Sequence, residues 1–349
     1  MNDKVDILSM SMDELIEFMV KIGEKKFRAK QIYEWLHEKR VSSFTEMTNI
    51  SKALQDKLAV NCDIVTLREV KKLESKDGTR KYLFELNDHH VVESVFMSYK
   101  HGNSVCISSQ VGCRMGCKFC ASTIGGLKRN LTVSEMLGQV YEINRISGQR
   151  ISNIVIMGTG EPLDNYDVLI KFIKIINSEE GMNISQRNIT VSTCGIIEKI
   201  NEIADENLKI TLAISLHAPN NSIRKTMMPI ANAYDYDLLI EACKDYVKKT
   251  KRRITFEYSL VKGVNDGIEC AKELSKVLKG ILCHVNLIPV NQVEERSYRH
   301  SSKDTILAFK NVLEKHKIPT TIRRELGSDI DAACGQLRRS YTKDNNKEV

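Results

Sequence analysis

From about residue 104 onward, short apolar segments rich in β-branched residues alternate with longer amphipathic segments. The first kind is typical of buried strands, and the second kind is typical of helices that cover a sheet. The expected strands are residues 105–108, 154–157, 189–192, 210–215, 254–260, 284–288 and 320–323. The expected helices include residues 133–146, 166–177, 236–249 and 302–315. This alternation predicts an α/β fold with a parallel sheet, as either an open doubly wound sheet or a full or partial barrel.

The first hundred residues follow a different pattern. Apolar residues recur at helical spacing after Ser11, around Trp35 and again between residues 50 and 58. Two strands are then expected on either side of an Asn-Asp turn, at residues 81–86 and 91–97. We therefore expect a small helical domain with a β-hairpin, followed by the larger α/β domain.

The expected domain boundaries follow from these patterns. They are residues 1–100 for the accessory domain, 101–341 for the α/β domain and 342–349 for a polar, disordered tail. A chain of 349 residues with 42% hydrophobic content can bury one large core and a small appendage.

The composition limits where the protein acts and what it binds. The start of the chain is polar, and no apolar run approaches membrane-spanning length. We therefore expect no membrane association and a cytoplasmic location, where the ten cysteines stay reduced. The formal net charge of +7 is a mild excess that permits a polyanionic partner such as RNA.

Three cysteines lie close together in one short segment. Cys113, Cys117 and Cys120 form a C-x3-C-x2-C pattern with glycines at positions 112 and 116. Three thiolates can bind a 4Fe–4S cluster on three irons, which leaves the fourth iron open to a small chelator. A structural zinc site normally needs two cysteine pairs or cysteines mixed with histidines, and no second C-x2-C follows. The pattern therefore predicts a catalytic iron–sulfur site.

Further polar residues follow the expected strands, and in parallel α/β folds reactive groups gather at this end of the sheet. Glycine and a carboxylate occur in the segment Gly-Thr-Gly-Glu-Pro, and hydroxyl, imidazole and amide groups follow later strands. These candidates are Gly160, Glu161, Ser192, Ser215, His217 and Asn291. A single histidine in an apolar run is more often a core residue, but His217 ends a strand.

One cysteine near the end of the chain has unusual neighbours in the sequence. Cys334 follows the last expected strand and has alanine and glycine neighbours in the segment from residue 329 to 337. Small neighbours suit an exposed, mobile thiol better than a core thiol.

The cysteine triad resembles the signature of the radical S-adenosylmethionine (SAM) superfamily. Together with the segment around Cys334, the chain is similar, nearly from end to end, to the RlmN/Cfr family of RNA methyltransferases. The resemblance implies a partial (β/α) barrel that holds a 4Fe–4S cluster, with SAM chelating the open iron. It implies Cys113, Cys117 and Cys120 as cluster ligands. The implied SAM contacts are Gly160, Glu161, Ser192, Ser215, Leu216, His217 and Asn291.

The resemblance also implies three catalytic residues. Cys334 corresponds to the methyl-carrying cysteine, Cys106 to its partner, and Glu93 to the proton acceptor. Two SAM molecules would be used in each turnover, one as methyl donor and one as radical source. A disulfide between the two cysteines would then have to be reduced.

The implied substrates are adenosine 2503 of 23S rRNA and adenosine 37 of tRNAs, methylated at C2 of adenine. A flavodoxin or ferredoxin system would supply electrons, and the protein would be a monomer. The basic residues 25–30, Lys128 and Arg129 are candidates for contacts with the RNA backbone.

Two alternatives stay open. One is methylation at C8, as in the Cfr branch, although Val111 stands where that branch carries cysteine and so favours C2. The other is a non-catalytic iron–sulfur protein that binds RNA or transfers electrons, which would require a fourth cluster cysteine.

Overall fold

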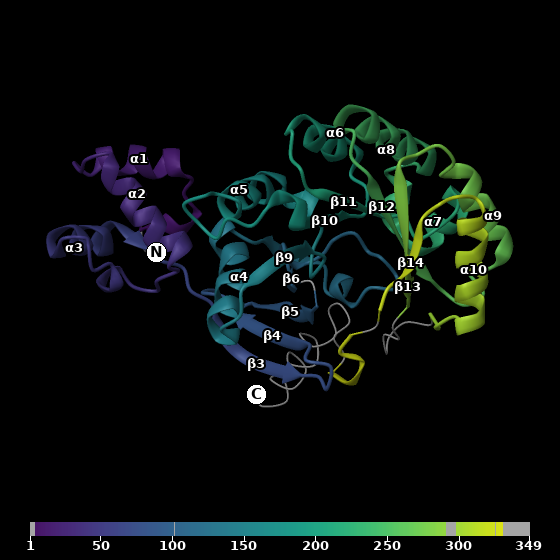
Figure 1. Ribbon diagram of the computed structural model, residues 1–349, viewed down its shortest axis with the longest axis horizontal. Helices are drawn as coiled ribbons and strands as arrows, with labels where there is room; N and C mark the ends of the chain where they lie inside the picture. Colours follow the sequence, from purple (N-terminus) through teal and green to yellow (C-terminus); the bar gives the residue numbers. More distant parts are fainter. Residues whose placement is uncertain (1–3, 101, 291–297, 325, 331–349) are drawn as a thin grey trace.

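The computed structural model describes residues 4–100, 102–290, 298–324 and 326–330. Within these residues one sheet of ten strands forms the centre of the molecule, in the order β14-β13-β12-β11-β10-β9-β6-β5-β4-β3 (Figure 1). The parallel strands are β6 (Gly102–Ile107), β9 (Ile151–Ile156), β10 (Ile189–Thr193), β11 (Thr211–Ser215), β12 (Ile254–Leu260), β13 (Cys283–Pro289) and β14 (Thr320–Ile322). All seven strands expected from the sequence are therefore present. The described edge strands do not pair with each other, so the sheet is an open, partial barrel.

Helices connect the parallel strands, as the alternating pattern predicted. They are α4 (Val133–Ser147), α5 (Tyr166–Ile176), α6 (Ile197–Asp205), α7 (Asn221–Met227), α8 (Tyr236–Thr250), α9 (Ile268–Val277) and α10 (Lys303–Lys315). The four helices expected from the sequence are confirmed, whereas α6, α7 and α9 were not expected. These three are short, with seven to ten residues each, so each gives little periodic signal.

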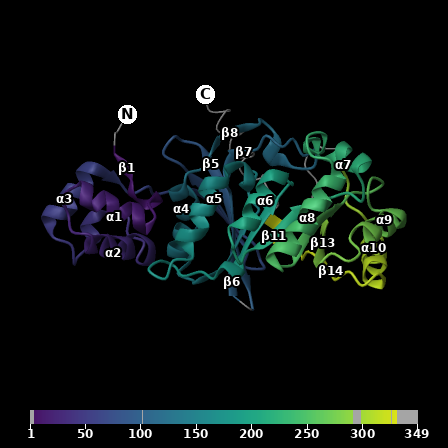
Figure 2. The ribbon, with the colours of Figure 1, turned by 90° about the horizontal axis from the view of Figure 1, so that it is seen from above.

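The N-terminal helices form a separate lobe at one end of the molecule (Figures 1 and 2). This lobe contains α1 (Met12–Lys21), α2 (Phe27–Tyr33), α3 (Lys52–Asn61) and the short parallel pair β1 (Val5–Asp6) and β2 (Cys62–Asp63). Helix α1 begins at a capping box in which Ser11 accepts from the backbone of Glu14 and the Glu14 side chain accepts from the backbone of Ser11.

The expected hairpin does not belong to the N-terminal lobe alone. Strands β3 (Arg68–Glu74), β4 (Arg80–Glu85) and β5 (Val91–Tyr99) are antiparallel, and β5 pairs with β6. The sheet thus crosses residue 100, the expected domain boundary, and β3 is a strand that the sequence pattern did not indicate. The three strands extend the parallel sheet because β5 supplies the edge hydrogen bonds that β6 would otherwise lack.

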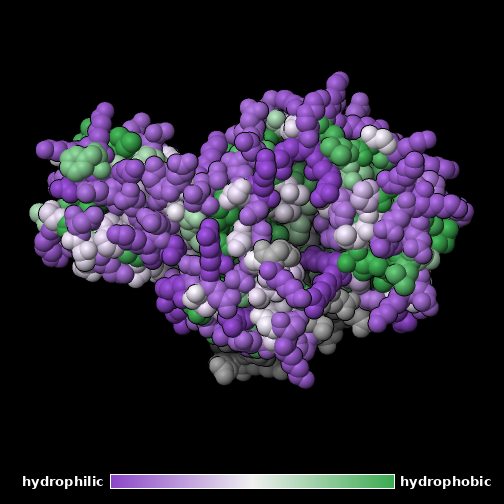
Figure 3. Space-filling view, in the orientation of Figure 1, coloured by the Kyte–Doolittle hydropathy of each residue, from purple (hydrophilic) through white to green (hydrophobic). Residues whose placement is uncertain are grey.

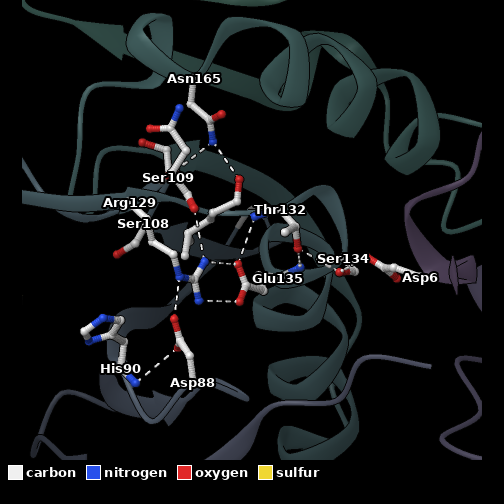
Figure 4. Close-up of polar contacts among 12 residues, drawn as sticks. Asp6, Asp88, His90, Ser108, Ser109, Arg129, Thr132, Ser134, Glu135 and Asn165 are labelled. Carbon is white, nitrogen blue, oxygen red and sulfur yellow. Dashed lines mark hydrogen bonds and ion pairs between the residues drawn. The ribbon is translucent and has the colours of Figure 1, made fainter. Parts of the chain in front are cut away.

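A polar cluster at the start of α4 links the lobe, the hairpin and the loop after β6 (Figure 4). Ser134 donates a hydrogen bond to Asp6 of the lobe (2.6 Å). Arg129 pairs with Glu135 of α4 (2.7 Å) and with Asp88 of the β4–β5 turn (2.6 Å). Two carboxylates already neutralise this guanidinium, so Arg129 is a poor candidate for binding RNA phosphate, contrary to the sequence-based expectation.

The outer surface is predominantly hydrophilic on the face shown in Figure 3. The exposed large apolar side chains of the described residues are distributed over separate elements, for example Phe27 of α2 and Leu238 of α8. None of the described helices has both the length and the apolar composition that crossing a membrane requires.

Candidate active site

A cavity of about 460 Å³ opens where the parallel strands end. Its wall is formed by the loop that follows β6, by the carboxyl ends of β9 to β13 and the residues next to them, by the segment after β14, and by the antiparallel strand β5. The structure brings together around it eight residues selected from the sequence: Cys113, Cys117, Cys120, Gly160, Glu161, Ser192, Ser215 and His217.

Other candidates lie elsewhere. Leu216 is fully buried, and its carbonyl accepts a hydrogen bond from Arg224 instead of facing the cavity. Asn291 and Cys334 lie outside the described residues.

The cysteine loop is shaped by tight backbone packing. Gly112 has φ +76°, and a side chain there would place its Cβ 2.0 Å from the carbonyl oxygen of Gly126. The Thr123 hydroxyl donates to the carbonyl oxygens of Cys117 (3.2 Å) and Cys120 (2.9 Å). These contacts fix the loop that carries the three thiols.

The three thiols have the chemistry of a cluster site. Cys113 and Cys117 are buried, and burial raises the pKa of the Cys113 thiol to about 12. A buried thiolate therefore needs a bound cation, which iron supplies. Within the described part of the chain, no three His, Cys, Asp or Glu side chains converge as ligands of a single ion would. Thiolates that bind three different irons do not have to converge in this way.

Gly160 allows the loop after β9 to pack directly on the cysteine loop. Its φ is +114°, and an added Cβ would lie 2.7 Å from Cβ of Gln110. The carbonyl of Thr159 accepts from the backbone N–H groups of Ser109 (2.9 Å) and Gln110 (3.1 Å), so neither backbone can easily move away.

Glu161 joins two of the loops that form the wall. Its carboxylate accepts from the backbone N–H of Leu163 (3.0 Å) and from that of Cys194 (2.7 Å). Burial raises the pKa of Glu161, and these hydrogen bonds act in the opposite direction. The carboxylate lines the cavity and has further lone pairs that an ammonium group could use.

His217 is both a satisfied buried residue and a wall residue. Its Nδ1 accepts from the backbone N–H of Ser259 (2.9 Å), and burial lowers its pKa to about 3. The imidazole is therefore neutral with its proton on Nε2. Its ring meets Phe119, within the cysteine loop, edge-on at 4.9 Å between centroids.

Arg224 of α7 is a residue that the sequence analysis missed. It is fully buried, and its guanidinium donates to the carbonyls of Cys194 (2.5 Å) and Leu216 (3.3 Å). Burial raises the pKa of the Cys117 thiol, and the Arg224 charge counteracts part of that shift. A single arginine in a short helix carries no sequence signal, because only the fold places it beneath the cysteine loop.

Glu93 and Cys106 lie on the cavity-facing side of the sheet. Val95 lines the cavity and pairs directly with Cys106 across β5 and β6. Side chains two apart on one strand share a face, so Glu93 lies on the same side as Val95. Glu93 forms a buried ion pair with Lys81 of β4, with 2.9 Å between Nζ and Oε1.

Comparisons with known proteins agree with this geometry. Residues 5–64 match the family described as ribosomal RNA large subunit methyltransferase N-terminal domain, and residues 107–274 match the radical SAM superfamily. A crystal structure of a radical SAM methyltransferase from Sphaerobacter thermophilus has a TM-score of 0.91 and 41% identity, over 95% of this chain and 98% of that chain.

Two curated relatives carry the name "Probable dual-specificity RNA methyltransferase RlmN". The protein of Lachnoclostridium phytofermentans is 61% identical over 97% of this chain and 96% of its own length. The protein of Clostridium tetani is 55% identical over the full length of both chains. The chain belongs to the RlmN family. It is a radical SAM RNA methyltransferase, and the expected family and fold class are confirmed.

Membership of the RlmN family implies a 4Fe–4S cluster and SAM, and the residues present fit both groups. Three thiols from one loop share the cavity with a buried carboxylate and with hydroxyl groups at the carboxyl ends of β10 and β11. These are the soft sulfur donors and the polar contacts that a cluster and a SAM molecule require.

A Gly160→Ala substitution is expected to destabilise the protein by about 1–3 kcal/mol, because the new methyl group overpacks against Gln110. The displaced cysteine loop should also bind less iron per chain on reconstitution. Urea unfolding and an iron assay measure the two effects. Gly267→Ala is the matched control, since nothing lies within 4 Å of its added Cβ. Equal stability and iron content in the two variants would contradict the packing role of Gly160.

Proposed function

We propose that this enzyme methylates C2 of adenosine 2503 in 23S rRNA and C2 of adenosine 37 in tRNAs. The observation that supports it best is that Cys106 lies opposite Val95, two residues along β5 from Glu93, on the sheet face that borders the cavity. A base and a thiol are both needed for a reaction in which a methyl carrier must later be detached from RNA.

The residues divide the work as follows. Cys113, Cys117 and Cys120 hold the cluster, and Gly160, Glu161, Ser192, Ser215, His217 and Asn291 contact SAM. When bound, the cluster and two SAM molecules supply a methyl group and the radical that activates it.

Cys334 carries the methyl group on its sulfur and delivers the methyl carbon to adenine C2. Glu93 accepts the proton from C2; its side chain is 5% exposed and held by Lys81, so bulk water does not compete for this position. Cys106 then attacks the sulfur of Cys334, which releases the methylated RNA and forms a disulfide. A flavodoxin or ferredoxin system supplies electrons.

We propose the location, the oligomeric state and the roles of the parts of the chain on the basis of the same resemblance. The enzyme acts as a cytoplasmic monomer, with residues 1–100 as an RNA-contacting accessory part that also supplies Glu93 from β5, residues 101–341 as the radical SAM part with the catalytic cysteines, and residues 342–349 as a tail. The exposed basic residues Lys25, Lys26 and Lys30 of the lobe are better placed than Arg129 to contact RNA phosphate.

The deciding experiment is anaerobic turnover of reconstituted protein with SAM, a reductant and 23S rRNA, followed by mass spectrometry of nucleosides. 2-Methyladenosine at position 2503 is expected. 8-Methyladenosine would instead favour the Cfr-type alternative. If no methylated adenosine is found, the proposal is overturned and the non-catalytic alternative is favoured. For that alternative, Cys194 in the cavity wall offers a fourth cysteine.

A further inference from the structure

The turn between β3 and β4 is hydrogen-bonded to residues 327–329, the segment that precedes Cys334 in the sequence. Asp329 accepts hydrogen bonds from the Ser75 hydroxyl (2.5 Å) and from the backbone N–H of Lys76 (3.2 Å). In the opposite direction, Asp77 accepts from the backbone N–H of Gly327 (2.9 Å). Each segment thus supplies one carboxylate that binds the other, across about 250 residues of sequence.

The β3–β4 turn is also held by hydrogen bonds within itself. The backbone N–H of Ser75 donates to the carbonyl of Thr79 (2.8 Å), and the second oxygen of Asp77 accepts from the N–H of Thr79 (2.9 Å). Gly78 completes the turn with φ +86°, which other residues rarely adopt. Both oxygens of Asp77 are therefore fixed in direction.

Both carboxylates are charged at neutral pH. The N–H of Gly327 is the main cause that lowers the pKa of Asp77 to about 2, and the Ser75 hydroxyl is the main cause that lowers the pKa of Asp329. Hydrogen bonds to ionised acceptors are stronger than those between neutral groups. The two segments are thus held together more firmly than an ordinary loop contact would hold them.

The contact between the β3–β4 turn and residues 327–329 lies at the wall of the cavity. Thr79, Arg324, Leu326 and Gly327 all line its wall. Cys334 follows Asp329 by five residues, and five residues of chain span at most about 18 Å. A fixed Asp329 is therefore an anchor only five residues from the proposed methyl carrier.

We propose that Asp77 and Asp329 are positioning residues that hold the C-terminal segment at the cavity mouth, so that Cys334 can meet Cys106. This inference rests on the roles given to the two cysteines in the proposed function. It adds a positioning role for the β3–β4 turn. The turn itself neither touches the substrate nor carries the methyl group.

The test uses the full-length protein without cluster, SAM or RNA, in which Asp77→Asn and Asp329→Asn each replace one accepting oxygen by an amino group. Hydrogen exchange of the peptide covering residues 326–330 should become at least about tenfold faster in both variants. Formation of the Cys106–Cys334 disulfide with diamide, followed by peptide mapping, should slow at least about tenfold. The double variant should show exchange at least as fast as the faster single variant, since each change removes a different hydrogen bond between the same two segments.

Asp56→Asn is the matched control, because Asp56 makes only an exposed pair with Lys52 in α3. It should leave exchange and disulfide formation unchanged, and all variants should keep the wild-type unfolding midpoint within about 2 °C. Wild-type exchange rates in the Asp77 and Asp329 variants would show that these carboxylates do not hold the segment of residues 326–330. Faster exchange with an unchanged rate of disulfide formation, or a wild-type protein that never forms this disulfide, would overturn the positioning role. Failure of the proposed function would instead be seen separately, as absence of 2-methyladenosine from wild-type turnover.

Discussion

Replacing Lys81 with methionine is expected to lower the free energy of unfolding by about 3–5 kcal/mol, because it leaves the Glu93 carboxylate buried without its cation. The side chains of Lys81 and Glu93 are only 1% and 5% exposed, so water cannot replace the lost partner. Urea unfolding at neutral pH measures the change, and the slope of the transition should stay constant.

The double variant Lys81→Met, Glu93→Leu separates stability from catalysis. Removing both charges should restore most of the stability, since a buried ion pair replaced by apolar residues is often neutral in folding free energy. The double variant should nevertheless show no methylation, because Glu93, the proposed base that takes the proton from adenine, is missing. Lys52→Met, which removes an exposed ion pair, should change stability by less than about 1 kcal/mol. A Lys81→Met protein as stable as the wild type would show that the pair does not hold Glu93.

A Cys106→Ala enzyme is expected to stop within its first turnover, with RNA joined covalently to Cys334. In the proposed reaction the Cys106 thiolate is the group that attacks the sulfur linking the methyl carbon to the protein, so its removal should leave that bond intact. A denaturing gel of the reconstituted reaction should show one slow-migrating protein–RNA species, and digestion with mass spectrometry should locate the modified nucleoside on the Cys334 peptide.

Two controls identify the linkage. Cys106→Ala combined with Cys334→Ala should give no covalent species, because the methyl carrier is missing. Cys270→Ala, a change of a half-buried cysteine in α9 away from the cavity wall, should keep multiple turnover. Free methylated RNA released repeatedly by the Cys106→Ala enzyme would disprove the role assigned to Cys106.

The repeating part of the fold could be predicted well because its signals are local. A strand such as β12, with all seven of its residues buried, carries an apolar residue at every second position, and this period of two is visible in the sequence. Long helices such as α4 and α8 also show their periodicity directly. Strand β3 was not predicted, since its residues are mostly polar and at least partly exposed, and only pairing with β4 makes it a strand.

The candidate site divides in the same way. Cys113, Cys117 and Cys120 could be selected from their spacing alone, because a cluster ligand set is written in one short segment. Lys81 and Arg224 could not be selected, since each acts through a partner that is distant in sequence or through backbone carbonyls. Arg129 shows the reverse case, in which a basic residue that looked available is already bound by Asp88 and Glu135.

The sequence by itself determined the family, the seven parallel strands and the longer helices, and it predicted the sulfur ligands, because these depend on residue type and short-range periodicity. Only the tertiary structure decided that β5 joins the sheet by antiparallel pairing with β6, which places Glu93 and Cys106 on one face, with Cys106 opposite Val95. It alone also decided that Asp77 meets the segment before Cys334. The physical reason is that hydrogen bonds and buried ion pairs across a sheet join residues whose separation along the chain carries no pattern.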